Sequence, residues 1–176
     1  MIRPRMGIHV PVTGRKVGMA TGRASDRLSR RPGSSEIAGA LFGIGVAAFV
    51  DETVFHQLLH WHHFYDKSTT DVGLVSDGLF HAFGWFAVVA GLFWLGGLRS
   101  RRALDWRRWA GGALLGAGAF QLYDGTVQHK LMRLHQIRYD VDITPYDVTW
   151  NIIAAIMIAI GLAILLVARR GRPRLS

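Results

Sequence analysis

The sequence GIGVAAFVDETVFHQLLHWHH, residues 43–63, returns 73 residues later as GAGAFQLYDGTVQHKLMRLHQ, residues 116–136. Eight aligned positions are identical, and they include two glycines, one aspartate and two histidines in each segment. Apolar residues alone would not align these positions, so we interpret the two segments as an internal repeat. The segments that follow match more weakly, Asp77-x-x-x-His81 against Asp147-x-x-x-Asn151. A repeated unit of two helices predicts two halves with the same orientation, related by a pseudo-two-fold axis.

Four apolar segments predict that the chain spans a membrane. Each is close to the roughly 20 residues that a helix needs to cross a bilayer, and hydrophobic residues make up 50% of the 176 residues. The segments are Ile37–His60, Leu79–Leu98, Trp109–Leu131 and Val148–Ala168. We therefore expect an all-α membrane protein with four transmembrane helices, formed by duplication of a two-helix unit.

Charged residues predict the orientation of these helices. Arginines and lysines dominate residues 1–35, the connection 99–108 and the C-terminal tail, whereas the other two connections carry six of the twelve acidic residues. The positive-inside rule then places both termini in the cytoplasm. The formal charge of +9 indicates contact with anionic lipids at the cytoplasmic face, and no nucleic-acid partner is expected.

Composition divides the chain into three parts. Residues 1–35 are typical of a basic, disordered cytoplasmic arm, residues 36–170 form the four-helix transmembrane domain, and residues 171–176 form a basic cytoplasmic tail. The arm lacks the apolar core of a signal peptide, and translation could start at Met1 or at Met19. Cysteine is absent, which excludes disulfides, thiolate metal sites and a cysteine nucleophile.

Polar side chains fall at matching depths in the four segments. Counted at about 1.5 Å per residue, Asp51 and Asp124 lie roughly 21–22 Å from the cytoplasmic ends of their helices. Four further residues lie at roughly 27–30 Å, near the outer boundary: His56, His81, His129 and Asn151. An unpaired carboxylate inside the membrane costs about 2.5–3.5 kcal/mol, so we expect both aspartates to face the interior of the bundle.

The histidines predict a metal site at the outer end of the bundle, because imidazole and carboxylate are the ligands that borderline divalent metals prefer. The expected ion is Zn²⁺, Cu²⁺ or iron. We predict His56 and His129 as core ligands and His81 as the third, with Asp77 orienting His81. Three residues could complete the set: Glu52, His60 and His63. Supporting or proton-relay roles are predicted for Asp51, Asp124, Asp77, Asp147, Asn151, His62 and His135.

Helical geometry separates some of these residues. On continuous helices, Asp51 and His62 share a face, as do Asp124 and His135, but about three turns apart. We therefore expect no direct contact within either pair.

Several functions stay open from the sequence. The protein could be an accessory or assembly factor that holds a metal, a small membrane enzyme with a metal-bound water, or a proton or ion relay built on the buried aspartates. Two histidines could instead be axial ligands of haem b, which is less favoured because the glycines nearby more often allow close helix packing. A homo-oligomer is also compatible with the sequence.

The motifs FVDETVFHQLLHWHH, DGLFHAFGW and DGTVQHKLMRLHQ together resemble a family of uncharacterised bacterial four-helix membrane proteins, a domain of unknown function. The resemblance covers residues 36–168 and implies a fold but no reaction. The family pattern has Asp-Gly where this chain has Asp51-Glu52, and His-His where it has His135-Gln136. The resemblance also implies a cytochrome oxidase or its assembly factors as partners, and hence copper or haem. The sequence offers few soft ligands for Cu(I), because only Met132 and Met157 lie within or near the spans.

Overall fold

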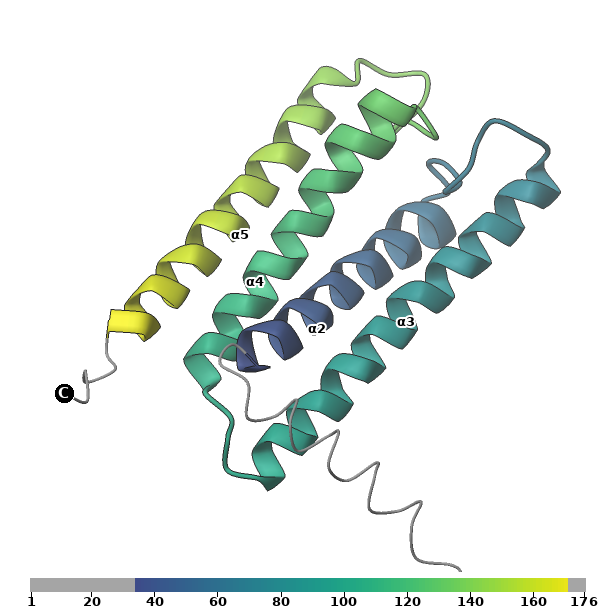
Figure 1. The fold of residues 1–176 in the computed structure, drawn as a ribbon. Helices are drawn as coiled ribbons and strands as arrows, with labels where there is room; N and C mark the ends of the chain where they lie inside the picture. The colour runs from purple at the N-terminus through teal and green to yellow at the C-terminus, as the bar shows by residue number, and fades with distance from the viewer. Residues whose placement is uncertain (1–33, 171–176) are drawn as a thin grey trace, which may run out of the picture.

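Helices account for almost all of the structure. The computed structural model describes residues 34–170, so most of the predicted arm and the whole tail lie outside the described residues. The four long helices are α2 (Ser34–Asp51), α3 (Thr70–Ser100), α4 (Trp106–Tyr123) and α5 (Thr144–Arg170) (Figure 1). Residues 34–170 contain no strand, which confirms the all-helical class predicted from the sequence.

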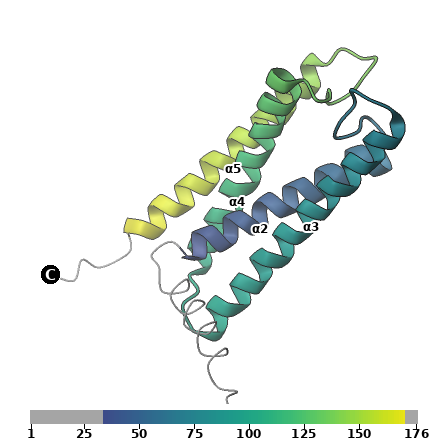
Figure 2. The ribbon, with the colours of Figure 1, turned by 45° about the vertical axis from the view of Figure 1, so that its right-hand side comes forward.

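The helices α2 and α4 form the centre of the molecule. They lie side by side and run in the same direction, while α3 packs on α2 and α5 packs on α4 (Figures 1 and 2). Both central helices therefore end at the same side of the molecule, where the connections 59–69 and 133–143 also lie. We call this side the histidine end.

Glycines spaced four residues apart bring α2 and α4 into backbone contact. A Cβ atom on any of the four would collide with a main-chain carbonyl of the facing helix, so only glycine allows this approach. The contacts pair Gly39 with Trp109, Gly112 with Glu36, Gly43 with Ala113 and Gly116 with Ala40. The repeat relates these contacts in pairs. The contact of Gly39 with Trp109 corresponds to that of Gly112 with Glu36, and the contact of Gly43 with Ala113 corresponds to that of Gly116 with Ala40, each residue being shifted by 73.

Polar contacts fix the other end of the central pair. Asp105 caps α4 by accepting a hydrogen bond from the Arg108 backbone N–H at 3.1 Å, which satisfies one of the free donors of the first turn. The buried Arg108 side chain donates from Nη1 to Glu36 Oε1 of α2 at 2.9 Å. The starts of both central helices are thereby held at one level.

Three of the described helical stretches are long and apolar enough to cross a membrane: Ser34–Leu58, Thr70–Ser100 and Thr144–Arg170. Large apolar side chains face outward on α3 and α5, among them Phe86, Phe93 and Leu166. The predicted span Trp109–Leu131 is not one of the three, because its glycines, Gln121 and Asp124 lower its mean hydropathy.

Gly116→Ala should destabilise the bundle by about 1–3 kcal/mol, the usual cost of overpacking, because the added Cβ would overlap the carbonyl of Ala40. Gly96→Ala is the matched control, since a Cβ there has nothing within 4 Å. Thermal unfolding in detergent would compare the two variants with the unaltered protein. Equal melting temperatures for all three proteins would contradict the role of the α2–α4 contact.

Candidate metal centre

Both central helices change geometry before they end. The π-helix η1 (Glu52–Leu58) continues α2, and the π-helix η2 (Asp124–Met132) continues α4. Each is followed by a backbone hydrogen bond that spans six residues and measures 2.9 Å: Trp61 N to Phe55 O, and Leu134 N to Gln128 O. These two bonds lie 73 residues apart. Such wide helical turns are rare in proteins and are frequent at functional sites.

Left-handed residues then reverse the chain. His60 has φ 51° and Arg133 has φ 52°, so the segments that follow turn back over the helix ends. The expectation that Asp124 and His135 cannot touch is therefore wrong, because His135 Nε2 lies 3.7 Å from Asp124 Oδ1. A continuous helix would have carried His135 away, but the helix ends at Met132.

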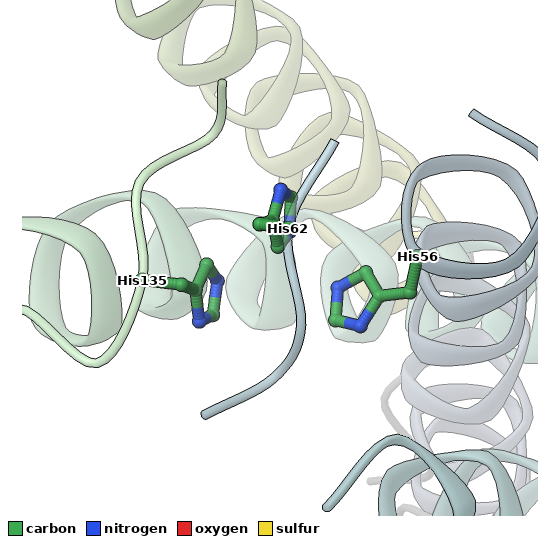
Figure 3. A group of neighbouring side chains, drawn as sticks. All are labelled: His56, His62 and His135. Carbon is green, nitrogen blue, oxygen red and sulfur yellow. The ribbon is translucent and has the colours of Figure 1, made fainter. Parts of the chain in front are cut away.

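Four buried histidines meet at this end and form what we call the histidine cluster: His56, His62, His129 and His135. His62 lies between His56 and His135, with ring centroids 4.4 and 4.5 Å away (Figure 3). The ring of His129 lies 4.7 Å from that of His135. One nitrogen from each of His56, His62 and His135 lies within 4.8 Å of the others.

Hydrogen bonds between the two connections orient two of these rings. His62 Nδ1 lies 3.0 Å from the carbonyl oxygen of Ile137, and His135 Nδ1 lies 2.9 Å from that of Phe64. The two bonds are equivalent in the repeat, because His62 and Phe64 correspond to His135 and Ile137, 73 residues later. A carbonyl only accepts, so both rings must carry their proton on Nδ1, and each Nε2 is left with a free lone pair.

Carboxylates orient His56 in the same way. Its Nδ1 lies 3.0 Å from Glu52 Oε2 and 3.1 Å from Asp77 Oδ1. Ionised carboxylates only accept hydrogen bonds, so Nδ1 carries the proton in this ring too. Histidines that ligate metals commonly donate their second ring N–H to a carboxylate or a carbonyl.

The remaining nitrogens are buried without partners. Among residues 34–170, the Nε2 atoms of His56, His62 and His135 have no hydrogen-bond partner, and leaving such an atom unsatisfied costs about 1–3 kcal/mol. Tetrahedral zinc with Zn–N bonds of 2.0–2.1 Å places its ligand atoms roughly 3.4 Å apart. To hold an ion, the nitrogens would have to move closer than the observed spacing of up to 4.8 Å, and the stacked rings of His62 and His135 would have to rotate, because the lone pair of an imidazole lies in the plane of its ring.

Aspartates supply oxygen atoms beside the rings. Asp124 Oδ2 lies 3.1 Å from His129 Nε2, and Asp124, His129 and His135 form a second group with ligand atoms within 4.8 Å. Asp51 Oδ2 lies 4.0 Å from His56 Nε2. Both aspartates thus face the interior of the bundle, at the ends of the two central helices.

Burial keeps the histidines of the connections neutral. It lowers the pKa of the His62 imidazole far below its usual value, and the neighbouring His135, His56 and His129 lower it further. Burial also lowers the pKa of His135, to about 4, against the opposing effect of Asp124. Neutral imidazole is the form that binds metals.

A family model described as "Predicted membrane protein (DUF2243)" matches residues 38–168. The chain belongs to this family. The resemblance to an uncharacterised membrane family predicted from the sequence is confirmed, and the family has no known function. No curated protein and no solved structure matches the chain.

In this DUF2243 member, Asp77 contacts His56 and the connection 59–69 instead of His81. Its Oδ2 lies 2.6 Å from His63 Nδ1, and its Oδ1 accepts from the Phe64 backbone N–H at 2.6 Å as well as contacting His56. The predicted pairing of Asp77 with His81 is therefore corrected. The His81 ring packs instead against Phe49, with centroids 5.1 Å apart.

The other predicted ligands lie around the cluster. Glu52 and His63 contact its edge through His56 and Asp77, whereas His60 is exposed at the chain reversal. Neither His60 nor His81 belongs to a group of described residues that could hold an ion. Metal ligation by any of these residues stays a prediction.

The second repeat differs at the matching positions. Gly125 stands where the first repeat has Glu52, and a Cβ there would lie 2.6 Å from the Trp150 ring. Asp147 pairs with Lys130, and Asn151 Nδ2 donates to the Asp147 carbonyl at 2.8 Å. Neither Asp147 nor Asn151 belongs to a group of described residues that could hold an ion.

From the sequence, only supporting roles are predicted for His62 and His135. The signal that could have found them is the repeat, because the two histidines occupy equivalent positions in segments that otherwise differ around them. Counting residues along continuous helices does not predict their proximity, because the helices end at Leu58 and Met132, before either histidine.

Asp77→Ala should loosen the first connection, because the variant leaves the Phe64 N–H and the His63 imidazole without the carboxylate that accepts from them. Asp71→Ala, which changes an exposed residue in the first turn of the same helix, is the control. Hydrogen exchange at the backbone amides of residues 62–66 would accelerate in Asp77→Ala only. Unchanged protection in that variant would show that Asp77 does not hold the connection.

Proposed function

We propose that this protein is an integral membrane protein that binds a divalent transition metal in the histidine cluster. One observation carries the proposal: three buried imidazoles have their Nδ1 atoms bonded to acceptors, whereas their Nε2 atoms have no hydrogen-bond partner among residues 34–170, and one nitrogen of each ring lies within 4.8 Å of the others. Buried polar atoms in proteins are normally satisfied. A metal ion would satisfy all three at once.

The ligand set favours a borderline ion. His56, His62 and His135 would supply three nitrogens, with His129 and Asp124 able to complete the sphere from the adjoining group. Nitrogen and oxygen ligands without thiolate suit Zn²⁺, Cu²⁺ or iron. A dication would also compensate the charge of the buried carboxylates.

The charge balance supports a cation independently. Four carboxylates are buried at the histidine end: Asp51, Glu52, Asp77 and Asp124. Within residues 34–170, their ion-pair partners are histidines only, and no arginine or lysine reaches them. Buried carboxylates need a compensating positive charge, which either a metal ion or protons would provide.

A closed site suits binding or electron transfer better than hydrolysis. The candidate ligands are at most 6% exposed, whereas catalytic zinc keeps an open position for water or substrate. An accessory or assembly factor for a respiratory redox enzyme, with a cytochrome oxidase or its assembly factors as partner, is therefore favoured over a metal-dependent enzyme. Haem b is less supported, because the rings of the cluster contact each other and the large cavity described below has no histidine in its lining.

A proton relay is the second candidate, and one chain of contacts favours it. From the interior, Asp51 lies 4.0 Å from His56, His56 lies 3.1 Å from Asp77, and Asp77 lies 2.6 Å from His63. The His63 side chain is 27% exposed. This series leads from the membrane interior to the surface, as proton pathways built from aspartate and histidine do.

The metal proposal predicts that full-length protein purified in mild detergent binds about one equivalent of Zn²⁺ or Cu²⁺. His62→Ala should lose most of that metal, because it removes the ring that lies between His56 and His135. His60→Ala removes an exposed imidazole two residues away and should keep the metal. Elemental analysis after loading and desalting would measure both, and an absorption spectrum would detect haem.

Two results would contradict the metal proposal. One is wild-type protein that takes up neither Zn²⁺ nor Cu²⁺ nor iron, which would favour the proton relay. The other is equal metal content in His62→Ala and His60→Ala, which would place the metal elsewhere on the chain.

We also propose that all four helices span the bacterial inner membrane, with both termini cytoplasmic, and that the two halves arose by duplication. The reciprocal contacts at a separation of 73 support the duplication. The charge asymmetry supports the orientation, and α4 would cross in the middle of the bundle, shielded by α2 and α5.

Reporter fusions would test this topology. Fusions within 59–69 and 133–143 should both be periplasmic, because these connections lie at the same end of the structure, and a fusion at 101–105 should be cytoplasmic. A cytoplasmic signal from either of the first two connections would contradict four spans with this orientation.

A further inference from the structure

A large cavity opens on one side of the bundle, outside the histidine cluster. It has a volume of about 730 Å³ and lies between α2, η1, α4 and α5. Aromatic rings form much of its wall: Phe55, Trp61, Phe120, Tyr146 and Trp150. Along α5 it runs from Tyr146 to Met157, which is about 17 Å at 1.5 Å per residue.

The two halves differ at this position. In the first half, the buried Phe80 of α3 stacks on Phe64 and Phe120, with centroids 4.7 and 6.0 Å away. The position 70 residues later is Trp150, whose Nε1 donates to the Gln121 carbonyl at 2.9 Å. That bond holds the indole against the wall, so the space beside it stays open.

Arg138 lies beside the cavity, over two of the aromatic rings that line it. The Arg138 guanidinium lies over the Trp61 ring at 4.9 Å and over the Tyr146 ring at 5.6 Å, and its Nη1 donates to the Tyr146 hydroxyl at 2.7 Å. Among residues 34–170, no carboxylate forms an ion pair with Arg138, whereas the nearby Lys130 pairs with Asp147. The guanidinium is thus held in place with donors left for an anion.

The wall of the cavity is mostly apolar. Asp51 is the one charged residue in the lining, but it is only 4% exposed and its Oδ2 lies toward His56 Nε2. The wall therefore offers hydrocarbon and aromatic surface, and the single available charge is positive and lies beside the cavity. An amphipathic anion matches this arrangement.

We propose that the cavity binds a hydrocarbon chain of an anionic phospholipid whose phosphate is bound by Arg138. Arginine binds phosphate through parallel N–H donors, and basic sites between membrane helices recognise anionic headgroups. The chain would lie along α5 beside Trp150. The cavity adjoins the histidine cluster, because its lining includes Asp51 and Ile137, which contact His56 and His62.

Brominated lipids provide a direct test, because bromine on the acyl chain quenches tryptophan fluorescence on contact. Full-length protein would be reconstituted in phosphatidylcholine vesicles and titrated with brominated phosphatidylglycerol or brominated phosphatidylcholine. We expect saturable quenching by the phosphatidylglycerol at low mole fraction, and only weak, non-saturating quenching by the phosphatidylcholine. Trp150→Phe should remove a large share of the saturable component.

Arg138→Gln isolates the headgroup. It should weaken phosphatidylglycerol binding about tenfold, the effect expected when a charge-assisted hydrogen bond is lost. Arg133→Gln removes the same charge from an exposed site in the same connection and should change binding little. Circular dichroism would verify that both variants are folded.

Three outcomes would overturn the proposal. Equal quenching by the two lipids would show that the headgroup is not recognised. Equal loss in Arg138→Gln and Arg133→Gln would reduce the effect to general surface charge. Saturable quenching by a lipid-soluble quinone, with none by either phospholipid, would assign the cavity to a different ligand.

Discussion

The close approach of α2 and α4 is the constraint on which the rest of the structure depends. Because four glycines let these helices meet backbone to backbone, their parallel axes end side by side, and the residues that follow each helix meet those that follow the other. A side chain at any of these glycines would separate the helices and pull the two connections apart. The position of the histidine cluster thus depends on contacts made in the first halves of the two central helices.

The connections 59–69 and 133–143 complete the histidine cluster. Each turns back over the end of its own helix and offers a carbonyl to the histidine of the other, so that Phe64 binds His135 and Ile137 binds His62. This exchange fixes the ring tautomers and concentrates free Nε2 atoms in a space bordered by Asp51 and Asp124. Among residues 34–170, no lysine or arginine forms an ion pair with the four buried carboxylates, so a bound cation or protons must balance their charge.

Much of this arrangement could be predicted from the sequence, and the limits have physical causes. The repeat and the hydropathy predicted the helices, and helical counting correctly gave Asp51 and Asp124 matching positions. The reversals at His60 and Arg133 could not be predicted, because both residues adopt a left-handed conformation that usually belongs to glycine or asparagine. The same limit explains why His81 was preferred over His62: a straight helix brings His81 to the right depth, whereas only a reversed chain returns His62 to the cluster.

X-ray absorption spectroscopy of the full-length protein loaded with Zn²⁺ tests the central claim most directly. If the cluster binds the ion, the spectrum should show nitrogen and oxygen neighbours at about 2.0–2.1 Å, with the outer-shell scattering of at least three imidazoles. His9 is the one histidine that precedes the described residues, so three imidazoles could not come from the N-terminal segment. A spectrum with oxygen ligands and at most one imidazole would contradict the account.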